Sequence, residues 1–252
     1  MELAYIFPFS LIALVFFIWK LYRSGFFDNI EVSIVEDPPF ISKSLTVYYK
    51  YCIGRYKRGS GVLVEVARLM PGEATTFGIY YDDPEETREE LLQSAVGVVF
   101  CEDDRNLYED KYGVQLTNCG YDKLVIQPVQ RAVVARQRFN GIFSTFSLEN
   151  FLYPKLKTFV KIHKLEINLF VEFYSNGNVY VVLPLDHQNE FFVPQLMTMD
   201  ELETKLARRK WDSDVESDSR SDTEPEEDPG SEEEVRIASS NVIESQDDKK
   251  VL

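Results

Sequence analysis

The chain has 252 residues with 42 acidic and 27 basic side chains, and its net charge of −15 is concentrated between Asp212 and Glu234. The rest of the chain is nearly balanced, so it lacks the basic face that a general nucleic-acid binder needs, and no direct nucleic-acid partner is expected. Without the first 23 and last 41 residues, the length leaves room for one domain of about 170 residues with a buried core.

The N-terminal segment from Leu3 to Trp19 carries no charge and is followed by Lys20 and Arg23. Because a membrane-spanning helix needs about 20 mostly apolar residues, we expect residues 1–23 to form a transmembrane anchor. A cleaved signal peptide is the alternative, but that would require a basic start and a small-residue cleavage site. Positive charge after the span predicts a lumenal N-terminus and a cytoplasmic bulk.

Two further features favour the cytoplasm for the main part of the chain. No Asn-x-Ser/Thr glycosylation sequon is present. The three cysteines, Cys52, Cys101 and Cys119, are an odd number without a CxxC pair, which suits a reducing compartment.

After a short tether at residues 24–29, residues 30–199 have the patterns of a folded domain. Alternating or continuous apolar runs predict strands over residues 30–35, 44–53, 75–81, 95–101, 124–129, 132–139, 165–174 and 179–185. Helical spacing predicts helices over residues 62–70, 105–112 and 148–163, and another that begins at Pro84. The Asn176-Gly177 pair between two strands predicts a hairpin.

Strands that alternate with helices and include antiparallel hairpins indicate an α+β fold rather than a doubly wound one. The order of elements also suggests two similar halves. A possible helix at residues 200–211 then precedes a disordered acidic tail at residues 212–252, in which no hydrophobic periodicity is present.

Residues suited to catalysis are few, and we predict no catalytic, cofactor-binding or metal-ligating residue. Only His163 and His187 could act as imidazole bases, and neither has a neighbour at metal-ligand spacing. A small-molecule pocket is one alternative, lined by Glu172, Tyr49, Tyr51 and Tyr80. An exposed strand face is the simpler interpretation of the same residues.

The acidic tail contains a cluster of candidate phosphorylation sites, each with Asp or Glu three residues downstream: Ser213, Ser219, Ser221, Thr223 and Ser231. Phosphates there would add roughly −1.5 to −2 charge each and favour a basic partner surface. A tail that serves only as a solvating segment is an equal alternative.

The chain ends with Lys249 and Lys250 at the fourth and third positions from the C-terminus. Lysines at these positions match the dilysine signal by which coat proteins return membrane proteins to the endoplasmic reticulum. This match requires the cytoplasmic C-terminus that the charge pattern predicts.

Several segments resemble the testis-expressed protein 264 family of endoplasmic reticulum autophagy receptors. They are VEDPPFISKSLTVYYKYCIGRYKRGSG, FGIYYDDP, YPKLKTFVKIHKLEINLFVEFY, VVLPL and FFVPQL, in that order. The resemblance implies a two-lobed GyrI-like domain between a reticulum anchor and a flexible tail. It also implies a tail motif, aromatic-x-x-aliphatic, that binds GABARAP-type modifiers as an added strand. The family is further linked to a valosin-containing AAA ATPase in protein–DNA crosslink repair.

The tail departs from that motif. Trp211 is its only aromatic residue, Asp214 stands three positions on, and Val215 comes one residue late. Two other matches in spacing, Tyr121 to Leu124 and Tyr153 to Leu156, lie inside the predicted domain. Either a non-standard motif from Trp211 to Val215 serves, or the protein has another role on the same membrane.

The sequence therefore predicts a non-enzymatic receptor or adaptor in the reticulum membrane that recruits GABARAP-type modifiers. The alternatives are a membrane-tethered module that binds or hydrolyses a small molecule, and an adaptor for the AAA ATPase.

Overall fold

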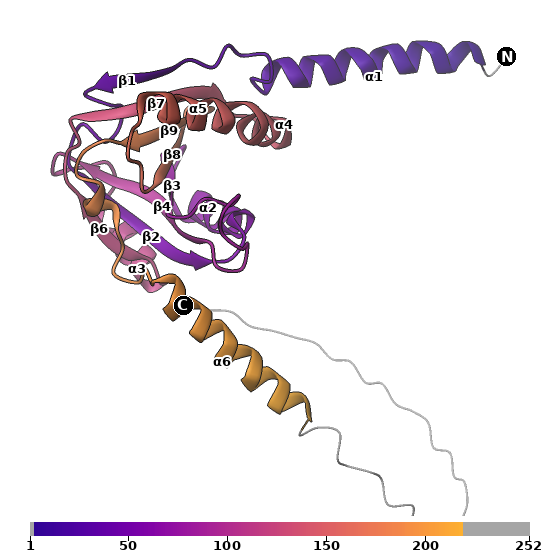
Figure 1. The fold of residues 1–252 in the computed structure, drawn as a ribbon. Helices are drawn as coiled ribbons and strands as arrows, with labels where there is room; N and C mark the ends of the chain where they lie inside the picture. Colours follow the sequence, from indigo (N-terminus) through magenta and orange to yellow (C-terminus); the bar gives the residue numbers. More distant parts are fainter. Residues whose placement is uncertain (1–2, 219–252) are drawn as a thin grey trace, which may run out of the picture. The chain divides into compact units, whose positions relative to one another are not determined.

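A computed structural model describes the backbone of residues 3–218 and the side chains of residues 10–208. The chain divides into two compact units, the first ending at Thr204 and the second beginning at Lys205. The first unit contains every strand that the structure describes and is built around one antiparallel sheet (Figure 1).

The sheet has the strand order β1-β7-β9-β8-β3-β4-β2-β6, with β5 paired to β4, and each pairing is antiparallel. Its strands are β1 Val32–Glu36, β2 Leu45–Ile53, β3 Thr76–Tyr80, β4 Gln93–Glu102, β5 Arg105–Asn106, β6 Asp122–Ile126, β7 Arg131–Arg138, β8 Phe170–Ser175 and β9 Asn178–Pro184. The predicted α+β class with antiparallel pairing is confirmed.

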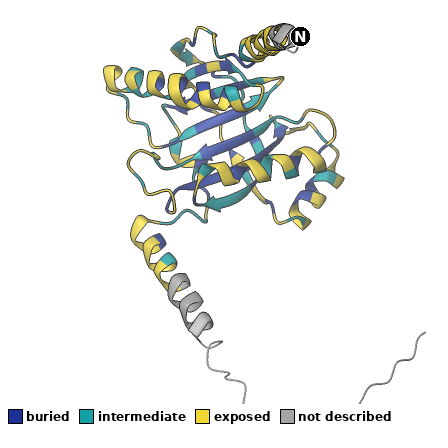
Figure 2. Cartoon of the chain, turned by 90° about the vertical axis from the view of Figure 1, so that its right-hand side faces the viewer, coloured by how far each residue is buried: buried dark blue, intermediate teal, exposed yellow. Residues whose placement is uncertain are grey.

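The helices are α1 Leu3–Arg23, α2 Gly59–Leu69, α3 Asp110–Asn118, α4 Ile142–Ser147, α5 Tyr153–His163 and α6 Met199–Asp218. A π-helical turn, Leu148–Leu152, joins α4 to α5, and short 3-10 turns occupy Tyr56–Arg58 and Gln188–Phe191. Helices of the domain cover one face of the sheet, whose central strands are buried (Figure 2).

The two faces of the sheet carry different cores. On the helix-covered face, one cluster packs around Leu152 and Leu156, and another around Val66 and Leu116. On the opposite face, a larger cluster includes Phe77 and is covered by irregular segments around residues 40–41 and 191–196. Burial on both sides explains why the strands in the middle of the sheet have few polar positions.

Strand β4 is the most buried element, since nine of its ten residues are buried. Its predicted burial on both faces is confirmed. At Gly97 the neighbouring strand comes so close that an added Cβ would lie 1.8 Å from the backbone oxygen of Tyr48. Only glycine fits this position without displacing β2.

The predicted hairpin is also confirmed, with Ser175 paired to Asn178. Asn176 and Gly177 both have positive φ, 50° and 69°. This geometry matches the right-handed twist of the flanking strands, which is why Asn-Gly is favoured there.

The helix predicted to begin at Pro84 is wrong, because residues 84–91 form turns. The Asp83 carboxylate accepts a hydrogen bond from the backbone N–H of Glu85 at 2.9 Å, which favours a turn at this point. Lys157 of α5 lies 2.9 Å from Asp83 and 3.0 Å from Glu85, so both acids bind a lysine of another element.

The helix predicted at residues 105–112 is also misplaced. Asp103 and Asp104 have φ of 47° and 60° and reverse the chain, which then pairs as β5 with the end of β4. Short polar side chains tolerate this left-handed geometry, and α3 begins only at Asp110.

The strand predicted from residue 165 begins at Phe170 instead. Lys164 ends α5 in the left-handed conformation, and the backbone N–H of Asn168 bonds the side chain of Gln188 at 3.0 Å. The segment between them is therefore fixed by a loop side chain rather than by a neighbouring strand.

Two predicted helices are longer than expected. The helical run predicted from Leu148 already begins at Ile142, and α6 extends to Asp218, beyond the predicted end at residue 211 and into the segment expected to be disordered. Neither Pro nor Gly occurs from Lys205 to Asp218, and Arg208 and Asp212 stand four positions apart, a spacing that supports helices.

Candidate functional site

A buried carboxylate on the helix-covered face is the most unusual chemical group in the domain. Glu172 lies in the middle of β8 with an exposed fraction of 3%. Tyr174 donates a hydrogen bond to one carboxylate oxygen at 2.5 Å, and Tyr153 of α5 donates one to the other. Both oxygens are therefore satisfied by phenol groups that carry no positive charge.

A third phenol comes from the adjacent strand. Gly78 of β3 stands opposite Glu172 in the sheet register, and Tyr80 follows two residues later on the same face. An added Cβ on Gly78 would lie 2.7 Å from the hydroxyl of Tyr80, so glycine leaves the space that this side chain occupies. The ring of Tyr56 packs edge-on against Tyr80 at 4.7 Å between centroids.

Burial dominates the electrostatics of this cluster. It raises the pKa of Glu172, although hydrogen bonds from Tyr153, Tyr174 and Tyr80 oppose that change. Burial and the adjacent Glu172 charge raise the pKa of all three tyrosines. The tyrosines therefore remain hydrogen-bond donors at neutral pH, and the cluster provides no activated nucleophile.

The structure brings together only two of the four residues predicted to line a pocket, Glu172 and Tyr80. Tyr49 and Tyr51 belong to the core on the opposite face of the sheet. There Tyr49 donates to the side chain of Gln195 at 2.8 Å, and Tyr51 donates to that of Gln93. Burial raises the pKa of Tyr51 to about 12.

Their placement follows from strand alternation, since residues 49 and 51 point away from residue 48, which faces the helices. Tyr49 and Tyr51 therefore hold the segment after Pro194 against the sheet rather than lining a ligand site. The prediction of a shared pocket is wrong for these two tyrosines.

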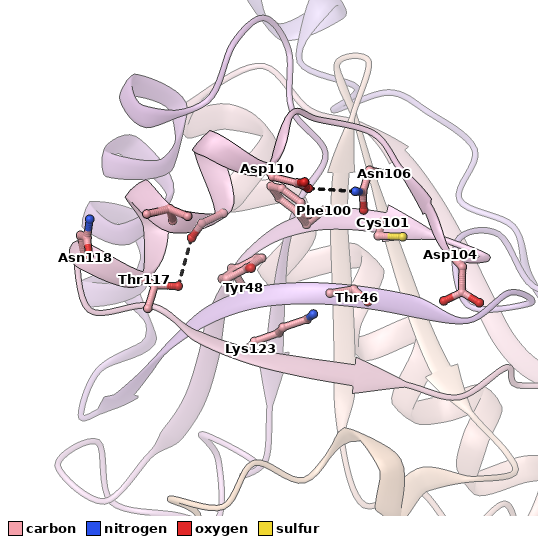
Figure 3. Close-up of a pocket in the computed structure, with 12 residues that line it drawn as sticks. Thr46, Tyr48, Phe100, Cys101, Asp104, Asn106, Asp110, Thr117, Asn118 and Lys123 are labelled. Carbon is pink, nitrogen blue, oxygen red and sulfur yellow. Dashed lines mark hydrogen bonds between the residues drawn. The ribbon is translucent and has the colours of Figure 1, made fainter.

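A pocket of about 510 Å³ lies elsewhere, between α3 and the strands beneath it (Figure 3). Its lining residues come from β2, β4, β5, α3 and β6 and the loops beside them: Thr46, Tyr48, Phe100, Cys101, Asp104, Asn106, Asp110, Gly113, Val114, Thr117, Asn118 and Lys123. None of the residues predicted from the sequence is among them, because the lining comes from five separate elements.

The lining of the pocket includes both charged and neutral polar side chains. The strands contribute Thr46, Tyr48 and Lys123, while the Asp110 carboxylate accepts a bond from Asn106 at 3.0 Å (Figure 3). Burial raises the pKa of the Cys101 thiol in the wall, so it stays neutral and unreactive. Such a surface suits a small polar molecule with donors and acceptors rather than covalent chemistry.

In the part of the chain that the structure describes, no group of three or more His, Cys, Asp or Glu side chains could hold a metal ion. Cys52, Cys101 and Cys119 are free thiols, and burial raises the pKa of Cys52 as well.

Among the residues that the structure describes, no helix is both long and apolar enough to cross a membrane. The described side chains begin at Ser10. The transmembrane anchor expected at residues 1–23 thus remains a prediction.

The tail sites can be placed only in part. The backbone at Trp211, Ser213 and Val215 is helical within α6. The other predicted sites, namely Ser219, Ser221, Thr223, Ser231, Lys249 and Lys250, lie outside the described residues. Of the two motif matches inside the domain, the first includes Tyr121 and the second Leu156, and both of these side chains are buried in the core.

Comparison with known proteins gives relatives of one kind, while no protein-family model matches the chain. The chain is 25% identical over 173 residues to human (Homo sapiens) testis-expressed protein 264 and 24% identical over 180 residues to its mouse (Mus musculus) homolog. Each match covers 69% of this chain and 54% of the relative, so the chain spans about half the length of the curated relatives it matches. The resemblance found in the sequence segments is confirmed as a similarity.

Two solved structures match the chain at low similarity. The EcmrR C-terminal domain superposes with a TM-score of 0.37 at 18% identity, covering 62% of this chain and 96% of that domain. A hydrolase from Listeria innocua gives a TM-score of 0.37 at 9% identity, covering 64% and 91%. At these scores no function is inferred from either structure.

Proposed function

We propose that this protein is a membrane-attached, non-enzymatic receptor or adaptor for selective autophagy of the endoplasmic reticulum. In this role α1 holds the chain in the reticulum membrane with its N-terminus in the lumen. The folded domain stands on the cytoplasmic side, and the acidic C-terminal segment recruits GABARAP-type modifiers of the phagophore.

The similarity to testis-expressed protein 264 over 173 residues is the observation that carries this proposal. The exposure of α1 adds physical support, because its large apolar side chains from Leu11 to Trp19 are each about half exposed or more. Burying this much apolar surface in lipid is favourable. Lys20 and Arg23 at its last turn favour the cytoplasmic side.

Recruitment by the tail then requires a change of conformation. A modifier-binding motif binds as an added strand, whereas Trp211 and Val215 stand in α6. The segment therefore unwinds before strand addition, and phosphorylation at Ser213 favours unwinding because negative charge is unfavourable near a helix C-terminus.

A pulldown of the full chain with GABARAP-type modifiers tests this proposal. We expect binding that increases after treatment with an acidophilic kinase and is lost in Trp211→Ala/Val215→Ala. The matched control is Val114→Ala, which changes an apolar side chain that is 61% exposed on α3. Failure of the full chain to bind before and after phosphorylation would remove the tail as the recruiting element.

Membrane attachment has a separate test. In microsomes, the full chain should resist extraction by alkaline carbonate. Release of the unaltered chain by carbonate would contradict anchoring. A co-purification experiment would show whether a valosin-containing AAA ATPase is a second partner.

Binding of a small polar molecule is a second candidate function, favoured by the pocket beside α3. Its volume of about 510 Å³ lies within the range typical of ligand sites, roughly 300–1,000 Å³. A thermal-shift screen of the full chain should find a ligand that raises the melting temperature. Lys123→Met should reduce that shift, whereas Lys43→Met, on the exposed surface outside the pocket, should not.

A further inference from the structure

A group of aromatic and aliphatic side chains is exposed where α1 enters the domain. We call it the phenylalanine patch, and it consists of Phe26, Phe27, Ile142, Phe143, Phe146 and Phe151. Four of its members are largely in contact with solvent: Ile142 is 84% exposed, Phe27 62%, Phe146 50% and Phe151 45%. Contiguous exposed apolar surface of this kind marks an interaction site.

The patch is internally packed rather than a set of isolated side chains. The centroid of the Phe26 ring lies 5.3 Å from the ring centroid of Phe27, 6.3 Å from that of Phe146 and 5.4 Å from that of Phe151. Residues of the N-terminal segment and of the α4 region therefore form one surface, although they lie more than a hundred positions apart in the sequence.

The segment predicted to be a tether is fixed against the domain. Ser24 is 1% exposed, and its backbone oxygen accepts a 2.7 Å hydrogen bond from the buried hydroxyl of Ser144. The Asp28 carboxylate pairs with the Arg138 guanidinium, which also lies over the ring of Tyr22 at 5.0 Å. Because of these contacts, the end of α1 does not move independently of the patch.

The patch also continues the apolar surface of α1. Phe17 of α1 packs edge-on against Phe143 of α4, with 5.5 Å between ring centroids. Neighbouring α1 residues such as Phe16 and Ile18 are more than half exposed. An apolar environment that surrounds this part of α1 would therefore also contact the phenylalanine patch.

We infer that the phenylalanine patch inserts into the lipid interface of the membrane that holds α1, so that the domain is held against the bilayer in one orientation. This inference rests on the proposed membrane attachment and adds a second contact to it. The occupant is a lipid surface, not a protein groove or a second copy of the chain. Aromatic side chains are favoured at the boundary between hydrocarbon and headgroups, where an apolar face enters about 5–10 Å.

The composition of the α4 region agrees with this assignment. Among the eleven residues from Ile142 to Leu152, Glu149 is the single ionisable one. At the end of α1, the cations of Lys20 and Arg23 suit anionic headgroups.

Site-specific photocrosslinking tests the inference in the full chain reconstituted into phosphatidylcholine–phosphatidylserine vesicles. The photoreactive residue p-benzoylphenylalanine replaces Ile142 or Phe146 in the patch, Phe16 in α1 as the membrane control, or Val114 on α3 as the matched exposed control. Each variant is first checked for a native circular-dichroism spectrum. Lipid adducts are then measured by mass spectrometry after irradiation.

Lipid adducts at positions 16, 142 and 146, with none above background at 114, are the expected result. Adducts at position 16 alone would overturn the inference and leave membrane attachment standing. Absence of adducts at position 16 would overturn both. Crosslinks from positions 142 and 146 to a second copy of the chain would also overturn it, because the patch would then be a protein interface.

Discussion

The hydroxyl of Ser144 donates a 2.7 Å hydrogen bond to the backbone oxygen of Ser24, and both residues are buried. The same hydroxyl accepts a 2.7 Å bond from the backbone N–H of Asn140. One small side chain thus links the exit of α1 to the turn before α4. This link makes the segment that follows α1 part of the domain.

Replacing Ser144 with alanine should reduce the free energy of unfolding by about 1–3 kcal/mol, because buried backbone groups lose their partner. The measurement is urea unfolding of the full chain in detergent micelles. Ser60→Ala is the matched control, since Ser60 also donates a 2.7 Å bond but is exposed, and its change should stay within about 0.5 kcal/mol. Equal effects of the two substitutions would refute the link.

The Asp28–Arg138 pair should stabilise the domain only above acidic pH. The hydrogen bond from Arg138 lowers the pKa of Asp28 below its usual value of 3.8. Its stabilising contribution is therefore present above pH 3.8 and is lost as pH falls through the lowered value.

Asp28→Asn should accordingly lower the free energy of unfolding by up to about 1 kcal/mol at pH 7, a small value because Arg138 is 40% exposed and water screens the pair. At a pH low enough to protonate Asp28, the substitution should have no effect. Unfolding curves at a series of pH values provide the measurement. Glu109→Gln serves as control because its pair with Lys111 is highly exposed. A cost that does not depend on pH would show that Asp28 acts through packing alone.

Glu172 should have the opposite pH dependence. Its pKa in the folded protein is raised above 4.5 by burial, so the folded state holds the proton more tightly than the unfolded chain. The contribution of this group to the free energy of unfolding is fully present below pH 4.5, and it is lost as pH rises through the raised pKa of the folded state.

Glu172→Gln removes this titration. As pH increases from 4 to 8, the urea midpoint of the wild type should therefore fall relative to the urea midpoint of the variant. Glu166→Gln, at an exposed position, should give a curve parallel to wild type. Parallel curves for Glu172→Gln as well would mean that its burial has no net cost.

Two glycines should respond in opposite directions to alanine. Gly97→Ala places a Cβ 1.8 Å from the Tyr48 backbone oxygen, so β2 must move, and we expect a loss of about 3 kcal/mol or more. Gly61→Ala lies in α2 with nothing within 4 Å, and we expect a gain of up to about 1 kcal/mol. Thermal or urea unfolding of both variants measures these values, and a stable Gly97→Ala protein would show that the strands can separate there.

The strongest local patterns predicted the sheet well. The continuous apolar run of β4 and the Asn-Gly hairpin both match the structure, because each depends on neighbours in sequence. The acids around Pro84 suggest a helix N-terminus, but Asp83 and Glu85 instead bind Lys157 of α5, a partner that local spacing does not identify.

The candidate site was predictable only in part for the same reason. Glu172 and Tyr80 could be chosen from strand patterns, but the register that places Gly78 opposite Glu172 depends on long-range pairing. Tyr153 belongs to a helix, and its approach to Glu172 follows from packing. The pocket beside α3 combines residues from Thr46 to Lys123, whose proximity no local pattern indicates.

The pairing of β1 with β7 has a consequence for biosynthesis. Val32 leaves the ribosome long before its partner Ala135, an interval of roughly 5–20 s at usual elongation rates. During that time the first strand has no neighbour with which to share backbone hydrogen bonds. The β1 edge of the sheet therefore forms only after β7 has been synthesised, although β1 is the first of the described strands to emerge.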